Sequence, residues 1–191
     1  MIVALFYEDL TYEDLVDWAG GQGVTRANRS EVGGWRIPDA DKAVLMEVGI
    51  PHTEDTPLTR VCFQGGPQPS LPTADGRLLY GMAEQQLSNL PDSVLTSSWA
   101  VEPDTGTVYY VQPDGEPWFA NSSVVLWVQC LHHYGLRVDT CDLLLNPDDH
   151  EEDAVLAELE ELAAELEECD PPAFAGYQGY IWAEFLARWL W

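Results

Sequence analysis

Apolar positions along the chain follow a helical period near the N-terminus, a strand-like pattern in the middle and a helical period again toward the C-terminus. A helix is predicted over Thr11–Ala19, where Thr11 and the acid three residues later have the spacing of a capping box. A second helix is predicted over about Ala40–Val48, because Gly49 suits the position after a last turn and a proline follows it. The polar stretch 20–34 between these helices reads as a linker.

The middle of the chain contains short extended segments separated by turn-forming residues. They are predicted at Leu58–Phe63, Arg77–Gly81, Val94–Val101, Thr107–Gln112 and Trp118–Ala120. The sequence Pro103-Asp104-Thr105-Gly106 is typical of a tight turn and lies between the third and fourth segments. We therefore expect these two segments to pair as an antiparallel hairpin.

An apolar helix is predicted after the last strand, capped by Asn121 or Ser122 and running to about Tyr134. It has too many apolar residues for a free surface helix, so it should pack on the sheet. The order of a helix, an antiparallel meander and another helix indicates an α+β fold, with helices packed on an antiparallel β-sheet.

The C-terminal part is acidic and has a helical pattern. Residues 148–170 include twelve Asp and Glu and no Lys or Arg. Four apolar residues, spaced by four, three and four positions, form one helical stripe: Val155, Leu159, Leu162 and Leu166. Four acids are predicted to project from the opposite side: Glu160, Glu161, Glu167 and Glu168. Pro171 should end this helix, and the aromatic segment Tyr177–Trp191 is expected to form a last helix that docks onto the domain.

These features divide the chain into an N-terminal helix and linker (1–34), an α+β core (35–147) and an acidic C-terminal extension (148–191) that packs on the core. Within the extension, like charges recur three and four residues apart, as at Glu161 and Glu165. Each such pair costs roughly a few tenths of a kcal/mol in an isolated helix. A basic partner would favour this arrangement, and a generally acidic, soluble surface is the alternative explanation.

The whole chain is strongly acidic. Its 191 residues contain 8 Lys and Arg against 33 Asp and Glu, a formal net charge of −25. Such a chain is not expected to bind nucleic acid or anionic membranes, because both need clustered cations, and no apolar run is long enough to span a bilayer. The N-terminus lacks the basic segment of a secretory signal, and the four cysteines are far apart and match reduced thiols. A cytoplasmic setting is therefore expected.

No sequence motif points to catalysis, a cofactor or a metal. The glycines near residue 20 lack the context of a phosphate-binding loop, and no serine stands in a GxSxG sequence. Four residues could be imagined as zinc ligands but match no common zinc spacing: Cys130, His132, His133 and Cys141. His52 and His150 are expected to be surface residues.

Eight tryptophans are many for a chain of this length. Most are expected in the core. Trp99, Trp118 and Trp191 could alternatively anchor a protein interface, since aromatic side chains dominate binding hot spots, but the core is the preferred interpretation for each.

Four motifs occur in order between Trp35 and Tyr134. They are IPDADKAVLMEVGIP at 37–51, LLYG at 78–81, DTGTVYYV at 104–111 and GEPWFANSSVVLWVQCL at 115–131. In these motifs the chain resembles the SUKH superfamily, and most closely its fourth family of bacterial immunity proteins. The last motif is the most specific, although Ala120 replaces the usual valine and Trp127 stands where phenylalanine is common.

The resemblance implies an α+β fold and a non-enzymatic role. Relatives are encoded beside polymorphic toxins, often nucleases or nucleic-acid deaminases, and bind them to protect the producing cell and its kin. The matched positions are expected to be structural, with Gly49, Gly81 and Gly106 in turns and Asn121 as a helix cap. The other matched positions are Pro51, Phe119, Ser122, Ser123 and Trp127.

We therefore expect a cytoplasmic immunity protein, monomeric or homodimeric, that uses no cofactor and neutralises a cognate toxin domain. The toxin is expected to be basic, because nucleases bind polyanionic substrates. The candidate partner-binding residues are Glu160, Glu161, Glu167 and Glu168. A non-catalytic adaptor of the same fold is the alternative, and an enzyme with an unrecognised carboxylate site is the more remote one.

Overall fold

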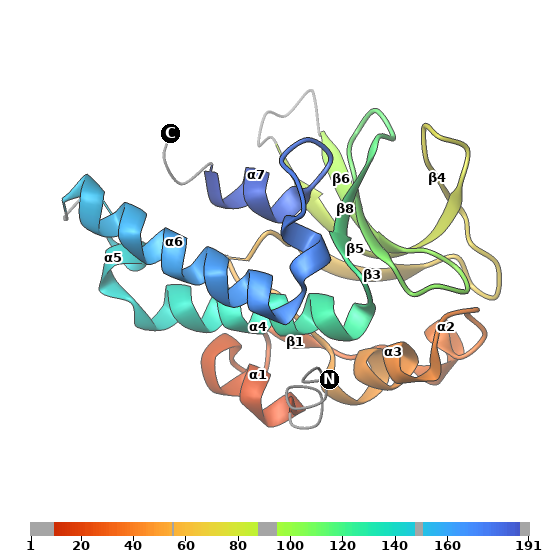
Figure 1. Cartoon of the computed structure of the whole chain (residues 1–191). Coiled ribbons are helices and arrows are strands. Elements are labelled where there is room, and N and C mark those ends of the chain that lie inside the picture. The colour runs from red at the N-terminus through yellow and green to blue at the C-terminus, as the bar shows by residue number, and fades with distance from the viewer. Residues whose placement is uncertain (1–9, 55, 88–94, 148–150, 188–191) are drawn as a thin grey trace, which may run out of the picture.

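The computed structural model describes residues 10–54, 56–87, 95–147 and 151–187. Over these residues the protein has the α+β fold that the sequence predicts. Figure 1 shows an antiparallel sheet on one side of the molecule and the two long helices α4 and α6 running side by side on the other. Val94, His150 and Trp191, which entered the sequence predictions, lie outside the described residues.

The main sheet has the strand order β3-β5-β6-β7-β8, and β4 pairs with β5 outside this order. The strands are β3 (Arg60–Gln64), β4 (Leu71–Pro72), β5 (Leu78–Gln86), β6 (Thr96–Val101), β7 (Val108–Val111) and β8 (Pro117–Asn121). The predicted hairpin is formed by β6 and β7, with Val101 opposite Val108. This part of the prediction is confirmed.

The predicted position of Gly81 is wrong, because this glycine lies inside a strand. It was expected in a turn at the end of a strand, but β5 continues past it to Gln86. The register with β6 shifts between Gly81 and Ala83, and a Cβ at position 81 would lie 3.3 Å from the Cβ of Gln64 on β3. Glycine therefore permits an irregularity and a close strand contact inside the sheet.

The N-terminal region is more structured than predicted. Helix α1 (Tyr12–Ala19) has Thr11 as its N-cap, and the predicted capping box with Asp14 is present. The stretch 20–34 is not a plain linker, because it contains β1 (Val24–Thr25) and α2 (Arg29–Val32). Three apolar residues in this polar sequence are buried in the main core: Val24, Ala27 and Val32. Too few apolar residues occur here to give a readable period.

The second predicted helix is present as α3 (Asp39–Ala43), which continues directly into the π-helical turn η1 (Val44–Val48). Gly49 follows with a φ of 96°, a conformation that favours glycine, and ends the helix as predicted. Strand β2 (Ile50–Pro51) comes next and pairs with β1.

Helix α4 (Val124–Thr140) is capped differently from the prediction. Ser123 is the N-cap, and its hydroxyl accepts a hydrogen bond from the Leu126 backbone N–H at 3.2 Å. Asn121 and Ser122 were proposed for this role, but Asn121 ends β8 and both have other partners. The helix also runs six residues beyond Tyr134, and the short helix α5 (Asp142–Leu145) follows it.

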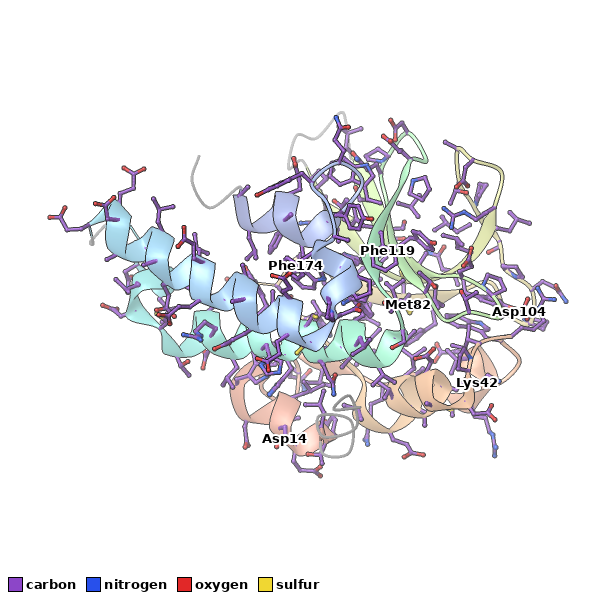
Figure 2. All side chains as sticks on the ribbon, viewed as in Figure 1. Asp14, Lys42, Met82, Asp104, Phe119 and Phe174 are labelled. Carbon is purple, nitrogen blue, oxygen red and sulfur yellow. The ribbon has the colours of Figure 1, made fainter. Side chains whose placement is uncertain are left out.

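The C-terminal region consists of α6 (Glu152–Cys169), the 3-10 turn η3 (Pro171–Phe174) and α7 (Ile181–Ala187). The predicted apolar stripe of α6 is buried, and α7 packs against α6, η3 and β8. Figure 2 labels Phe119 of β8 and Phe174 of η3, which pack against the core where the sheet meets these helices.

Tryptophans from one strand and two helices meet in the core. Trp99 of β6 lies with its ring centroid 5.5 Å from that of Trp127 on α4 and 6.4 Å from that of Trp182 on α7. All three are fully buried, so Trp99 is a core residue, whereas Trp118 is half-buried. Among the described helices, none has the length and apolar character needed to cross a bilayer.

Candidate partner-binding surface

The four candidate glutamates of α6 are all exposed, but they fall on two sides of the helix. Glu160 and Glu167, two helical turns apart, line a groove between α6 and α7. Glu161 and Glu168 lie on the side toward α4, where Glu161 approaches Arg137 and Glu168 borders His133. Figure 2 shows oxygen-tipped side chains projecting along the outer side of α6. The sequence predicted one acidic face on this helix, but the four glutamates lie on two different faces.

On the side toward α4, one guanidinium offsets much of the like-charge repulsion within α6. Arg137 of α4 donates to Glu158 at 2.5 Å and to Glu165, and its Nη1 lies 3.9 Å from Glu161 Oε2. Arg137 and Glu158 are mostly buried at the helix–helix contact. The repulsion predicted from the sequence included only the charges within α6, whereas this cation lies on the preceding long helix, α4.

The groove between α6 and α7 has a volume of about 360 Å³ and an apolar floor. Its apolar walls include Leu156, Ala163, Ala183 and Leu186. Glu160 and Glu167 stand on the α6 side, and the described residues that line the groove include no Lys or Arg. The groove therefore offers an apolar surface beside two carboxylates.

Tyr177 stands between this groove and a second hollow of about 570 Å³. The second hollow is also lined by Trp118, Glu116 and Glu184, and its described lining again includes no Lys or Arg. Tyr177 is 81% exposed, an unusual position for an aromatic side chain. The sequence predicts Tyr177 as the first residue of the last helix, but α7 begins only at Ile181, and this early helix start hid the exposed position of Tyr177.

A buried polar network holds the end of α6 and the start of α7 on the sheet. Asp170, only 1% exposed, accepts hydrogen bonds from Asn121 Nδ2 at 3.0 Å, from the Ser122 N–H at 2.7 Å and from the Ser122 hydroxyl at 2.8 Å. Asn121 Oδ1 in turn accepts from Trp182 Nε1 at 2.9 Å. The motif residues Asn121 and Ser122 thus position both helices that form the groove.

The SUKH-4 immunity protein family matches residues 10–188 of the sequence. The chain belongs to this family. The match extends beyond the motifs at 37–131 and includes α1, α6 and α7, so the groove is made of residues inside the match. The family supports a toxin-immunity role for this SUKH-4 protein, and immunity proteins of this kind are generally non-catalytic. No curated protein and no solved structure matches the chain.

The motif residue Gly106 of this SUKH-4 protein has a steric role. Asp41 of α3 is buried at the N-terminus of α4, where its Oδ1 accepts from the Val125 N–H at 3.1 Å. A Cβ on Gly106 would lie 2.0 Å from Asp41 Oδ2, and the φ of Gly106 is 78°. Burial raises the pKa of Asp41, although the helix amides that it accepts from oppose this.

Another hollow of the SUKH-4 protein, about 710 Å³, lies between the end of α1, the loop that precedes β3 and the end of β5. Its lining is mostly neutral, with several Thr and Gln side chains together with His52 and Glu54. His52 Nε2 is paired with the Thr25 hydroxyl at 2.8 Å, and burial lowers the pKa of His52. The hydrogen-bond partner of the His52 ring is therefore a neutral hydroxyl and not a carboxylate.

Two of the candidate zinc ligands of the SUKH-4 protein have other partners. His132 Nδ1 accepts from Trp18 Nε1 at 3.0 Å, and Cys130 is buried against Asn121 Nδ2 at 3.3 Å. Within the described ranges, no group of three or more His, Cys, Asp and Glu residues has an arrangement suited to a metal ion.

Proposed function

We propose that this SUKH-4 protein works in the bacterial cytoplasm and neutralises a cognate toxin by binding a cationic region of the toxin domain at the groove between α6 and α7. The observation that carries the proposal is the combination of an apolar floor, Glu160 and Glu167 at its side, and the exposed Tyr177 at its edge. A nuclease or nucleic-acid deaminase domain suits this surface, because proteins that bind polyanions present clustered Lys and Arg.

Three physical contributions make this groove a better candidate than the rest of the acidic surface. The apolar floor contributes about 25 cal/mol for each Å² that a partner covers. The two carboxylates favour a Lys or Arg over a neutral or acidic side chain. Tyr177 is exposed, so a partner guanidinium can contact the face of its ring. Tyrosine is also enriched among the residues that contribute most of the binding energy at protein interfaces. Glu161, by contrast, already has Arg137 nearby.

The test uses the toxin domain encoded beside the gene. Binding is measured by titration calorimetry, and protection is measured as survival of cells that co-express both proteins. Glu160→Gln with Glu167→Gln is expected to weaken binding by about 10- to 100-fold, and Tyr177→Ala by a similar factor. The matched control is Asp17→Asn with Glu47→Gln, which changes the net charge equally at exposed positions of α1 and η1. It should alter the affinity by less than about 3-fold.

Different outcomes test the assignment of the groove as the binding surface and the toxin-neutralising function itself. If the groove variants and the control weaken binding equally, a diffuse acidic surface carries the interaction and the groove assignment is wrong. If the wild-type protein forms no complex with the toxin domain and gives no protection, the toxin-neutralising function is wrong.

A further inference from the structure

A cluster of sulfur and imidazole groups lies on the α4 side of α6, away from the groove. Cys130 and His133 come from neighbouring turns of α4, and Cys169 is the last residue of α6. Side-chain hydrogen bonds join the Cys169 sulfur to the Cys130 thiol and to the His133 imidazole. All of the described cysteines are free thiols.

The two cysteines differ in their access to solvent. Cys130 is fully buried in the core, where Asn121 also contacts its sulfur. Cys169 is half-buried and lines a small hollow of about 70 Å³ together with His133, Glu165 and Glu168. A small solute can therefore reach Cys169 from the hollow, whereas Cys130, which contacts Cys169, is shielded from solvent.

Hydrogen bonds from Cys130 and His133 lower the pKa of the Cys169 thiol to about 5, against the opposing effects of burial and of Glu168. The same contact and burial raise the pKa of Cys130, and Cys169 raises the pKa of His133. Other charged or titratable groups facing the cluster are Glu165, Arg137, Asp170 and His132. The arrangement combines an accessible thiolate, an imidazole hydrogen-bonded to it and a buried thiol in contact.

We propose that Cys169 is a peroxide-reactive thiol and that Cys130 is its resolving thiol, so that oxidation by hydrogen peroxide ends in a disulfide joining α4 to α6. The proposal does not depend on the toxin or on the groove. It assigns a modification site to two cysteines whose sequence separation gives no CxxC signal.

The chemistry balances in two steps. The Cys169 thiolate attacks one oxygen of hydrogen peroxide, the O–O bond breaks, and the leaving hydroxide takes a proton to become water. The sulfur is oxidised by two electrons to a sulfenic acid. The Cys130 sulfur then attacks the Cys169 sulfur, the S–O bond breaks, and the hydroxyl leaves as water with the Cys130 proton. Two thiols and one peroxide thus give one disulfide and two waters.

The first experiment maps the product in the folded protein. The full chain is treated with hydrogen peroxide, the remaining thiols are blocked with N-ethylmaleimide, and unreduced peptides are identified by mass spectrometry. The expected main product is the Cys130–Cys169 linked peptide. Cys130→Ser should leave a Cys169 sulfenic acid that dimedone traps, and Cys169→Ser should leave Cys130 unoxidised. The control Cys141→Ser should give the same linked peptide as wild type.

A second measurement tests the thiolate directly, through the alkylation of Cys169 by iodoacetamide. At neutral pH a larger thiolate fraction is offset by a weaker nucleophile, so the absolute rate is a poor readout. The pH profile discriminates better. From about pH 7 to about pH 5.5 the rate at Cys169 should fall less than about 3-fold, whereas glutathione loses about 30-fold. His133→Gln should move the Cys169 profile toward that of glutathione.

Three results would overturn the proposal. One is a peroxide-treated wild-type protein whose Cys169 carries a persistent sulfenic or sulfinic acid while Cys130 stays reduced. Another is faster oxidation of Cys62 or Cys141 than of Cys169. The third is a Cys169 alkylation profile as steep as that of glutathione. Circular dichroism of each variant shows that the fold is retained before these results are compared.

Discussion

Asp170 joins the C-terminal region to the sheet through buried hydrogen bonds. It is buried at the end of α6 and accepts three hydrogen bonds from Asn121 and Ser122. These bonds span 48 and 49 positions in the sequence, so one carboxylate joins α6 to the end of β8. Removing it would leave buried donors without an acceptor, which costs more than the bonds themselves contribute.

Asp170→Ala is therefore expected to lower the free energy of unfolding by about 3 kcal/mol. Urea denaturation followed by tryptophan fluorescence measures the change. The control is Asp153→Ala, an exposed acid of the same helix, which should change stability by less than about 0.5 kcal/mol. A loss at Asp170 no larger than that of the control would show that water satisfies the donors.

Alanine substitutions at Gly106 and Gly76 can distinguish the cost of a steric clash from the cost of backbone strain. Both have positive φ, 78° and 87°, but a Cβ at 106 meets Asp41 at 2.0 Å and Pro38 at 3.0 Å, whereas a Cβ at 76 meets nothing within 4 Å. Gly76→Ala should lower the free energy of unfolding by about 1 kcal/mol from strain alone. Gly106→Ala should lower it by about 3 kcal/mol or more, because Asp41 is held by the N-terminus of α4 and has little freedom to move. Equal losses in urea denaturation would contradict the steric role.

The buried Asp41 predicts a pH dependence with a definite sign. Burial raises its pKa above the usual 3.8, so the folded protein holds the Asp41 proton more tightly than the unfolded chain does. The stability from the protonated form is complete below pH 3.8 and is lost as the pH rises through the folded-state pKa. Asp41→Asn cannot ionise. Its stability relative to wild type should therefore increase as the pH rises from 3.8, and then level off.

Urea denaturation of wild type and Asp41→Asn at a series of pH values tests this sign. A constant difference between the two proteins would mean that the charged carboxylate is as well stabilised by the amides of α4 as by water.

The residue-scale predictions from the sequence were good at selecting positions and poor at assigning roles. Asn121 was identified from its motif but was taken for a helix cap, because a cap is the local explanation for Asn or Ser before an apolar helix. Its partners, Asp170 and Trp182, lie 49 and 61 positions away. No local pattern reports such a pair, and neither Tyr177 nor the contact of Cys130 with Cys169 could be found in that way.

At the scale of elements, α6 shows how a helix with unfavourable internal charges can be stable within a fold. Its apolar stripe was predicted from spacing alone and is buried as expected. Its carboxylates Glu158 and Glu165 converge on Arg137 of α4, so the repulsion that an isolated helix would feel is offset across the helix pair. The charge pattern therefore also reflects the packing of α6, besides any partner.

Arg137→Gln should lower the free energy of unfolding by about 1 to 2 kcal/mol, because it leaves Glu158 mostly buried without its cation. The loss should be smaller in about 1 M salt, where the repulsion among the remaining glutamates is screened. Arg36→Gln is the matched control, since its pair with Asp104 is 3.6 Å long and exposed on both sides (57% and 70%). That change should stay below about 0.5 kcal/mol in urea denaturation. Equal effects would mean that Arg137 acts only as a surface charge.

Element prediction succeeded where periodicity or turn chemistry was strong and failed where burial depended on isolated residues. The β6–β7 hairpin was specified by its turn sequence, and α1 by its capping box. The stretch 20–34 was misread because Val24, Ala27 and Val32 are buried one at a time against distant elements. The end of β5 was misplaced because a glycine that ends a strand and a glycine at an irregularity look alike in sequence.

At the scale of the whole molecule, a net charge of −25 acts over distances that no single contact reaches. A field of this kind raises the rate at which a cationic partner meets the protein, and salt reduces that effect. Contacts in a groove act later, once the partner is seated, and they mainly determine how long it stays. The diffuse charge and the groove should therefore affect different rate constants.

Surface plasmon resonance with the toxin domain proposed as the partner can separate these two rate constants. Glu160→Gln with Glu167→Gln should raise the dissociation rate constant by about 10-fold or more and lower the association rate constant by less than about 3-fold. Asp17→Asn with Glu47→Gln removes the same charge away from the groove, and it should lower the association rate constant by a similar factor while leaving dissociation unchanged. Raising the salt from about 0.05 M to about 0.5 M should slow association for every variant and largely remove the difference between the control and wild type, since screening then acts within about 4 Å. If the groove variants changed only association, the carboxylates beside the apolar floor would be part of the general field and would make no contact with the bound toxin.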